Sequence, residues 1–232
     1  MVLMAPGINC DRETAEACRL AGATVETVHL NELLDGRRRI LDFAFLLLAG
    51  GFSYGDHLGA GAMLATVLRH QLFDDLRRFV DDGRPVLGIC NGFQILSRLG
   101  FLGDVALIPN ASGNFSCRWV PMEVLESPCI FTRDLEWLDL PIAHGEGRVV
   151  VDHEKLHSIL PLAPLRYLDN PNGSVADIAG VCNERGNVFG LMPHPERYLT
   201  PLHHPDWQRR LELPPAGLRL FENAVGYVRR EL

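Results

Sequence analysis

A short apolar run that ends in Gly-x-Cys-x-Gly constrains the fold of this chain more than any other segment. Residues 85–89 predict a buried strand, Gly88, Cys90 and Gly92 form the motif, and residues 92–99 predict an amphipathic helix. A strand, a sharp turn and a helix in this order are the setting of a nucleophile elbow, here with a thiol in place of a hydroxyl. The segment therefore predicts a local fold and a candidate nucleophile together.

The residue types of this motif suit a reactive thiol. Small residues two positions before and after Cys90 let the strand and the helix pack closely around a strained backbone. The positive end of the helix favours thiolate over thiol, and the amide N–H of Asn91 points to where a tetrahedral oxyanion would form. An isolated cysteine between glycines would be interpreted as a core residue, whereas the flanking strand and helix favour a nucleophile.

Strand-like and helix-like segments alternate through the first half of the chain. This pattern predicts a doubly wound α/β fold, with a mostly parallel central sheet and helices on both faces. The predicted strands are residues 2–5, 23–30, 43–49 and 85–89, and the predicted helices are residues 11–20, 61–70, 72–82 and 92–99.

The second half carries short strand-like segments separated by turns, which predict antiparallel additions to the sheet. They are residues 117–125, 147–151, 165–168, 177–182 and 188–192. A helix is expected over residues 216–230. Because no linker or repeat interrupts the chain, residues 1–232 are expected to form a single domain.

Composition excludes several classes of protein. Twenty-two basic residues against 29 acidic ones give a formal charge of −7, which argues against a nucleic-acid-binding face. The six cysteines are widely spaced, with no C-x-x-C pair and no H-E-x-x-H, so neither disulfides nor a metal site are expected. No apolar stretch reaches 18 residues and no basic leader precedes an apolar segment, which predicts a soluble, cytoplasmic protein.

A second segment supplies a candidate base. The apolar residues 188–192 run into Pro193-His194-Pro195-Glu196. The prolines are expected to hold the backbone extended, so that His194 and Glu196 lie on one face and the carboxylate orients the imidazole. That is the arrangement of a nucleophile–base–acid triad. On its own a histidine between prolines is more often a turn residue, but Cys90 and His194 both follow predicted strands, where open α/β sheets place their sites.

A third segment ends the buried strand 43–49 in Gly50-Gly51. Free N–H groups on this turn could supply a second oxyanion donor, at Gly51. A Gly-Gly turn is more often an ordinary connection, and it gains weight only beside the other two segments.

These segments together resemble the triad (class I) glutamine amidotransferases, whose fold is flavodoxin-like. More narrowly, they resemble the glutaminase components of phosphoribosylformylglycinamidine synthase. Ala49 and Gly59 depart from residues that are common in that family. The segments that carry the resemblance are residues 6–11, 50–56, 88–94, 142–148, 170–174 and 192–197.

The resemblance implies a mechanism. Cys90 attacks the side-chain amide of L-glutamine, His194 held by Glu196 transfers protons, and a γ-glutamyl thioester is hydrolysed to glutamate. Gly51 and Asn91 would donate backbone N–H groups to the oxyanion. The resemblance also implies that glutamine is held by Gln94, His144, Gly145, Glu146 and Gly147.

It further implies partners. Ammonia would pass to a large synthetase subunit, with a small third subunit as a further candidate, and ATP and Mg²⁺ would bind to the synthetase. No cofactor is expected in this chain, which lacks a G-x-x-x-x-G-K-[ST] loop, and neither nucleic acid nor membrane is an expected partner.

Three alternatives stay open from the sequence. Deglycase- or peptidase-like thiol hydrolases share this kind of elbow, but they commonly carry a histidine where Asn91 stands. A glutaminase for another acceptor is disfavoured by residues 52–56 and 170–174. A scaffold subunit without activity is disfavoured because Cys90, His194 and Glu196 are all present.

Overall fold

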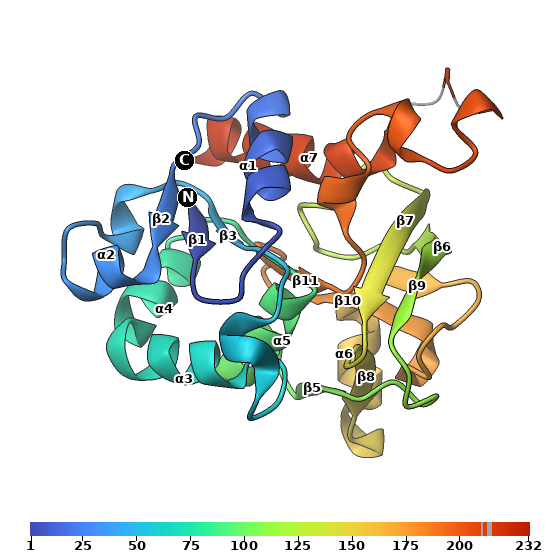
Figure 1. Ribbon diagram of the computed structural model, residues 1–232, viewed down its shortest axis with the longest axis horizontal. Coiled ribbons are helices and arrows are strands. Elements are labelled where there is room, and N and C mark those ends of the chain that lie inside the picture. The colour runs from blue at the N-terminus through green and yellow to red at the C-terminus, as the bar shows by residue number, and fades with distance from the viewer. Residues whose placement is uncertain (210, 213–214) are drawn as a thin grey trace.

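The computed structural model describes residues 1–209, 211–212 and 215–232, which form a central β-sheet between two groups of helices (Figure 1). The strands are β1 (Val2–Met4), β2 (Thr27–His29), β3 (Leu46–Leu48), β4 (Val86–Ile89), β5 (Val105–Ile108), β6 (Ser116–Val124), β7 (Trp137–His144), β8 (Arg148–Val151), β9 (Leu165–Tyr167), β10 (Ile178–Cys182) and β11 (Val188–Leu191). The helices are α1 (Asp11–Leu20), α2 (Leu30–Leu34), α3 (Ala62–Gln71), α4 (Phe73–Asp81), α5 (Asn91–Leu99), α6 (Leu156–Ile159) and α7 (Ala216–Glu231).

The main sheet has nine strands in the order β2-β1-β3-β4-β11-β10-β9-β6-β7. The first five run parallel, and from β11 onward each strand is antiparallel to its neighbour. Because β4 and β11 are adjacent and parallel, the residues that follow them emerge at one edge of the sheet. Cys90 follows β4 and His194 follows β11, so the topology brings the two segments together.

The parallel strands are buried on both faces. Every residue of β3, β4 and β11 is buried, which explains why their sequences are continuous apolar runs. Helix α5 packs against β3, β4 and β11 and contacts α3, while α1 contacts β1 and α7. Figure 1 shows α3, α4 and α5 on one side of the sheet and α1 and α7 on the other. The doubly wound, mostly parallel α/β fold with antiparallel additions is therefore confirmed.

Two details of the strand prediction are wrong. The segment 147–151 was expected to extend the main sheet, but β8 pairs with β5 in a separate two-stranded sheet. The segment 188–192 was expected among the antiparallel additions, but β11 is parallel to β4, while β10 makes the first antiparallel pair. Apolar content predicts that a strand exists, whereas its partner is decided by how the whole chain packs.

Two boundaries also differ. The strand expected over residues 23–30 is shortened to β2, because His29 caps the start of α2. The His29 ring accepts a hydrogen bond from the Asn31 N–H, and the Glu32 carboxylate accepts one from the His29 N–H. The sequence prediction also missed β5 and β7. Asp139 and Pro141 interrupt the apolar sequence pattern of β7. A proline is tolerated in this strand because β7 lies at the edge of the sheet.

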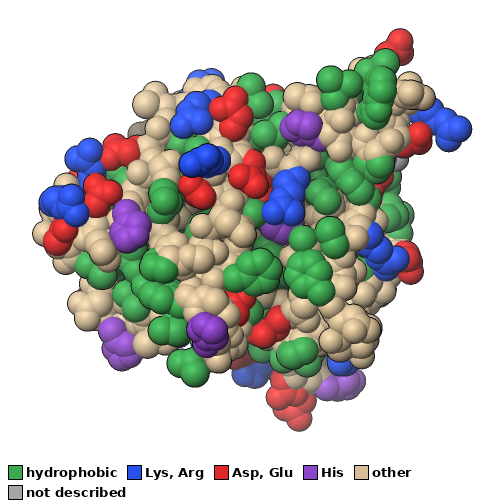
Figure 2. All heavy atoms as spheres, in the orientation of Figure 1, with side chains coloured by type: hydrophobic (Ala, Val, Ile, Leu, Met, Phe, Trp, Pro, Cys, Tyr) green, Lys and Arg blue, Asp and Glu red, His purple; other side chains and the backbone are tan. Residues whose placement is uncertain are grey.

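On the face in view, Lys and Arg side chains lie among Asp and Glu rather than forming a basic patch (Figure 2). Within the described ranges, no helix combines the length and apolar character needed to cross a membrane.

Candidate active site

Cys90 sits at a strained turn between β4 and α5. Its backbone has φ 51° and ψ −103°, a conformation that non-glycine residues adopt rarely, and its N–H donates to the Leu191 carbonyl oxygen at 2.8 Å. A Cβ at Gly92 would lie 1.9 Å from the Leu48 carbonyl oxygen, and one at Gly88 would lie 2.6 Å from the Gly92 oxygen. The strand and the helix therefore approach as closely as the elbow motif predicts.

His194 and Glu196 form a buried pair beyond the end of β11. His194 Nδ1 lies 2.6 Å from Glu196 Oε1, and the exposed fractions of the two residues are 2% and 1%. The His194 N–H donates to the Pro141 carbonyl oxygen at 2.8 Å, which ties this segment to β7. The backbone is not extended as expected, because Pro195–Arg197 forms a 3₁₀ turn; the pair meets through this turn instead.

The electrostatics of His194 depend on its two anionic neighbours. Burial alone would lower the pKa of His194, but the charges of Glu196 and of a Cys90 thiolate outweigh burial and raise this pKa well above its usual value. His194 Nε2 has no hydrogen-bond partner among the described residues, and Cys90 makes only a weak contact of 3.8 Å with the Ala143 carbonyl oxygen. The raised pKa favours the protonated form of His194, with its Nε2 left without a partner in the described part of the chain.

The Gly50-Gly51 turn borders the same site. A Cβ at Gly50 would lie 2.8 Å from Cε1 of His194, so only glycine fits against this ring. Gly51 has φ 150° and forms an antiparallel bridge with Ile8. The bonds of this bridge come from the flanking residues, Phe52 N–H to the Gly7 oxygen and Asn9 N–H to the Gly50 oxygen. The N–H of Gly51 is therefore not used in the bridge.

Cys10 is a second thiol at the site that the sequence analysis did not identify. Its Sγ accepts a hydrogen bond from Arg197 Nη2 at 3.1 Å, and Cys10, His194 and Glu196 place one ligand atom each within 4.8 Å of one another. Three such atoms could in principle hold a metal ion. The Arg197 guanidinium at the same sulfur places a positive charge where a cation would have to bind, which disfavours this use.

His144 lies at the end of β7, and its orientation is fixed on one side only. Its Nδ1 lies 3.0 Å from Asn110 Oδ1, which also accepts from the Gly147 N–H at 3.2 Å. A Cβ at Gly147 would lie 2.4 Å from the His144 ring. Burial, with a smaller contribution from the charge of His194, lowers the pKa of His144 to about 4. His144 is therefore a neutral imidazole whose buried Nε2 has no hydrogen-bond partner among the described residues.

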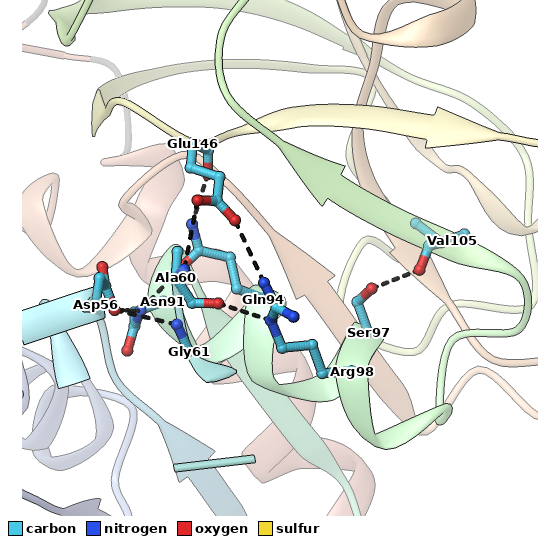
Figure 3. A network of polar contacts seen from close by, with 9 residues as sticks. All are labelled: Asp56, Ala60, Gly61, Asn91, Gln94, Ser97, Arg98, Val105 and Glu146. Atoms are coloured by element: carbon cyan, nitrogen blue, oxygen red, sulfur yellow. Dashed lines mark hydrogen bonds and ion pairs between the residues drawn. The ribbon is translucent and has the colours of Figure 1, made fainter. Parts of the chain in front are cut away.

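Two of the other predicted glutamine-binding residues, Gln94 and Glu146, lie in one polar network (Figure 3). Gln94 accepts from Asn91 Nδ2 at 2.8 Å and donates to the Glu146 carbonyl oxygen, so its amide already has partners on both sides. The Glu146 carboxylate lies 3.5 Å from Arg98 Nη2 and 3.4 Å from the Ala60 N–H. The structure thus brings Gln94 and residues 144–147 together beside the elbow.

Tyr167 of β9 is a further neighbour without a sequence signal. Its side chain is buried, and burial, together with the charge of Cys90, raises its pKa above the usual value for a phenol. Only the order of the strands places this residue within electrostatic range of the thiol, so no local pattern could have predicted it.

Comparisons with known proteins agree with this geometry. The sequence profile of the CobB/CobQ-like glutamine amidotransferase domain matches residues 1–228, and the chain belongs to this family. Within it, the chain groups with the glutaminase components of phosphoribosylformylglycinamidine synthase.

The relatives that support this grouping cover nearly the whole chain. The chain is 38% identical to phosphoribosylformylglycinamidine synthase subunit PurQ of Methanococcus maripaludis, over 98% of this chain and 96% of the relative. It is 41% identical to the subunit of the same name from Dehalococcoides mccartyi, over 99% of this chain and 97% of the relative. A chain in the structure of PurLQS from Thermotoga maritima matches with a TM-score of 0.82 and 37% identity, over 98% and 97%.

A more distant glutamine amidotransferase structure, also from Thermotoga maritima, matches with a TM-score of 0.58 and 16% identity, and shows the fold alone.

Proposed function

We propose that this chain is the glutaminase subunit of phosphoribosylformylglycinamidine synthase. It hydrolyses L-glutamine to glutamate and ammonia, and passes the ammonia to an ATP-dependent synthetase subunit that converts formylglycinamide ribonucleotide to formylglycinamidine ribonucleotide. The observation that carries the proposal is the strained Cys90 elbow next to the buried His194–Glu196 pair, in a chain that is similar to such subunits over its whole length. Deglycase- or peptidase-like chemistry has no comparable support.

In the acylation step, the Cys90 thiolate adds to the amide carbon of glutamine. The carbonyl electron pair moves to oxygen, and the N–H groups of Gly51 and Asn91 stabilise the negative charge that forms there. His194, protonated because Glu196 and Cys90 raise its pKa, gives its Nε2 proton to the departing nitrogen. The C–N bond breaks, ammonia leaves, and a thioester joins Cys90 to the glutamyl group.

In the second step, neutral His194 takes a proton from water as the water oxygen attacks the thioester. The C–S bond then breaks, glutamate leaves, and the thiolate–imidazolium pair is restored. Glu196 keeps the proton on Nδ1 throughout, so that Nε2 is the nitrogen that exchanges protons with the reacting groups.

Glutamine would lie between α5 and the turn after β7. His144 Nε2 has no hydrogen-bond partner among the described residues, and Gln94 and Glu146 fix the wall. Gly147 packs directly against the His144 ring, while space remains beside Gly145, whose nearest neighbour is the Phe115 ring. Buried polar atoms without partners are costly unless a ligand pairs with them, which supports His144 as a glutamine contact.

The proposal includes the setting of the reaction. The partner is a large synthetase subunit, with a small third subunit as a further candidate. This chain uses no cofactor or metal of its own, and ATP and Mg²⁺ bind to the synthetase. The location proposed is the cytoplasm, where the six unpaired cysteines would stay reduced.

The test is Cys90→Ser in the presence of the synthetase subunit. Glutamine-dependent synthesis should fall at least about 10³-fold, because a serine hydroxyl is not ionised by this histidine. Synthesis with added ammonium salt should stay within about twofold, because it bypasses the thioester. Cys117→Ser is the matched control, since Cys117 is an exposed thiol, and it should leave both activities unchanged. Equal loss of both activities in Cys90→Ser would contradict the proposal.

A further inference from the structure

The side chain of Asn91 joins the two segments that carry the proposed oxyanion donors. It is completely buried. Its Oδ1 accepts a hydrogen bond at 3.2 Å from the N–H of Ser53, which lies two residues after Gly51. Its Nδ2 donates to Asp56 Oδ1 at 3.2 Å (Figure 3). The carboxamide of Asn91 therefore fixes the segment of the second donor relative to the first, which is its own backbone N–H.

Asp56 holds this carboxamide and closes its own loop at the same time. Its Oδ1 also accepts from the Gly61 N–H at 3.1 Å. The backbone of this loop is strained at Tyr54 and Asp56, whose φ values of 53° and 52° lie in the left-handed region. Non-glycine residues keep such a conformation only where the surrounding contacts enforce it. The Asp56 carboxylate supplies those contacts on the side that faces the elbow.

The far end of the loop is held by a second set of contacts. The Ala60 N–H donates to Glu146 Oε2 at 3.4 Å, its carbonyl oxygen accepts from Arg98 Nε at 2.8 Å, and Arg98 and Glu146 form an ion pair at 3.5 Å. The loop 53–61 is thus fixed to α5 at Asn91 and to the turn after β7 at Glu146. Removing the Asp56 carboxylate would take away one acceptor of Asn91 Nδ2 and the bond to Gly61. The Ser53 N–H would stay bonded to Asn91 Oδ1, but the carboxamide that holds it would lose part of its own support.

We propose that Asp56 is a positioning residue of the oxyanion hole. Acting through the Asn91 carboxamide, it holds Gly51 and Asn91 so that both N–H groups face the glutamine oxygen as that oxygen becomes negative. Donors that are already in place need no reorganisation when the charge forms, which is the basis of their effect on rate. This inference rests on the proposed glutaminase function.

The experiment compares Asp56→Gly with Asp56→Asn in the full chain with its synthetase subunit. Glycine removes the carboxylate and accepts a positive φ, so it separates the lost contact from backbone strain. We expect Asp56→Gly to lower the glutaminase kcat about 10²-fold, the effect of losing one oxyanion donor, with KM changed less than about threefold. Asparagine keeps an oxygen that can accept from Asn91 and Gly61, and should restore kcat to within about threefold of wild type.

A second measurement separates positioning from general damage. Alkylation of Cys90 by iodoacetamide is a displacement at a saturated carbon and forms no oxyanion, so its rate should stay within about twofold in Asp56→Gly. Asp104→Ala is the matched control, because Asp104 pairs with Lys155 at 2.8 Å and lies outside this network.

Two results would overturn the inference: a kcat for Asp56→Gly within about twofold of wild type, or alkylation slowed by the same factor as kcat. Full glutaminase activity in Cys90→Ser would instead remove the proposed function itself, whatever Asp56→Gly does.

Discussion

Among the residues that the structure describes, two buried histidine–carboxylate pairs are found, and only one of them faces a thiol. In the first, His194 Nδ1 is 2.6 Å from Glu196 Oε1, and Nε2 has no hydrogen-bond partner within the described part of the chain. In the second, His204 Nε2 is 3.0 Å from Asp139 Oδ2. The two pairs are alike in residue types and in burial, so neither property distinguishes the proposed base from the other histidine.

The difference lies in the remaining ring nitrogen. His204 Nδ1 accepts a hydrogen bond from the Asp206 N–H at 3.0 Å, so both of its nitrogens are used. Its ring also packs against Trp119, with ring centroids 4.4 Å apart, and against Tyr198 at 5.5 Å. This pair anchors the segment after the Pro195–Arg197 turn to β7. A histidine held by a carboxylate becomes a base only where its other nitrogen is open toward a reacting group.

The largest expected effect compares the two carboxylates directly. Glu196→Ala should lower the glutaminase kcat by about 10³- to 10⁴-fold, because His194 loses its tautomer and its orientation. Asp139→Ala should leave the kcat of the folded enzyme within about threefold. Steady-state kinetics with glutamine measure both. Similar losses in the two variants would mean that the open nitrogen is not what distinguishes the pairs.

A third buried histidine extends the comparison, because His144 has an amide partner instead of a carboxylate. Its pKa is lowered to about 4, so between about pH 6.5 and pH 4 the unfolded chain binds a proton that the folded chain does not. The free energy of unfolding should therefore fall as the pH falls through this range. The loss attributable to His144 should reach about 3 kcal/mol.

Urea unfolding of wild type and His144→Asn at several pH values between 7 and 4 would measure this difference. Asparagine can keep the contact with Asn110 but does not titrate, so the variant should lose less stability as the pH is lowered. Parallel pH profiles for the two proteins would show that His144 is not buried in its neutral form.

The smallest expected effect concerns stability at neutral pH. Asp139→Ala should lower the free energy of unfolding by about 2 kcal/mol, because a buried histidine N–H loses its acceptor. Chemical denaturation would detect this change. Asp104→Ala, which removes an exposed carboxylate, is the control and should leave stability unchanged. An unchanged midpoint in Asp139→Ala would show that the second pair is not an anchor.

Part of the parallel half of the fold could be predicted from the sequence to within one residue. Helix α1 has the predicted bounds, and β4 and α5 differ from their predictions by one residue. Local patterns suffice there because a strand buried on both faces must be a continuous apolar run, and an elbow must have glycines where backbones touch. The antiparallel half was less predictable: β7 was missed, and β8 was assigned to the wrong sheet.

The site divides in the same way. The sequence singles out Cys90 and the pair His194–Glu196 because their segments carry local geometry that only certain residue types allow. Cys10 is not singled out, because its hydrogen bond at the site comes from Arg197, 187 positions away in the sequence. The sequence marks Asp56 only as the end of the segment 50–56, because nothing near it in the sequence shows that its carboxylate bonds the Asn91 side chain.

The sequence by itself determined where the backbone turns sharply, which strands are buried and which residues have reactive side chains, because sterics and solvation act on neighbours along the chain. Only the tertiary structure decided which histidine–carboxylate pair has a ring nitrogen without a partner among the described residues, and which carboxylate bonds the Asn91 side chain. Those outcomes depend on the order of strands in the sheet and on close packing between distant segments, and both are properties of the assembled fold.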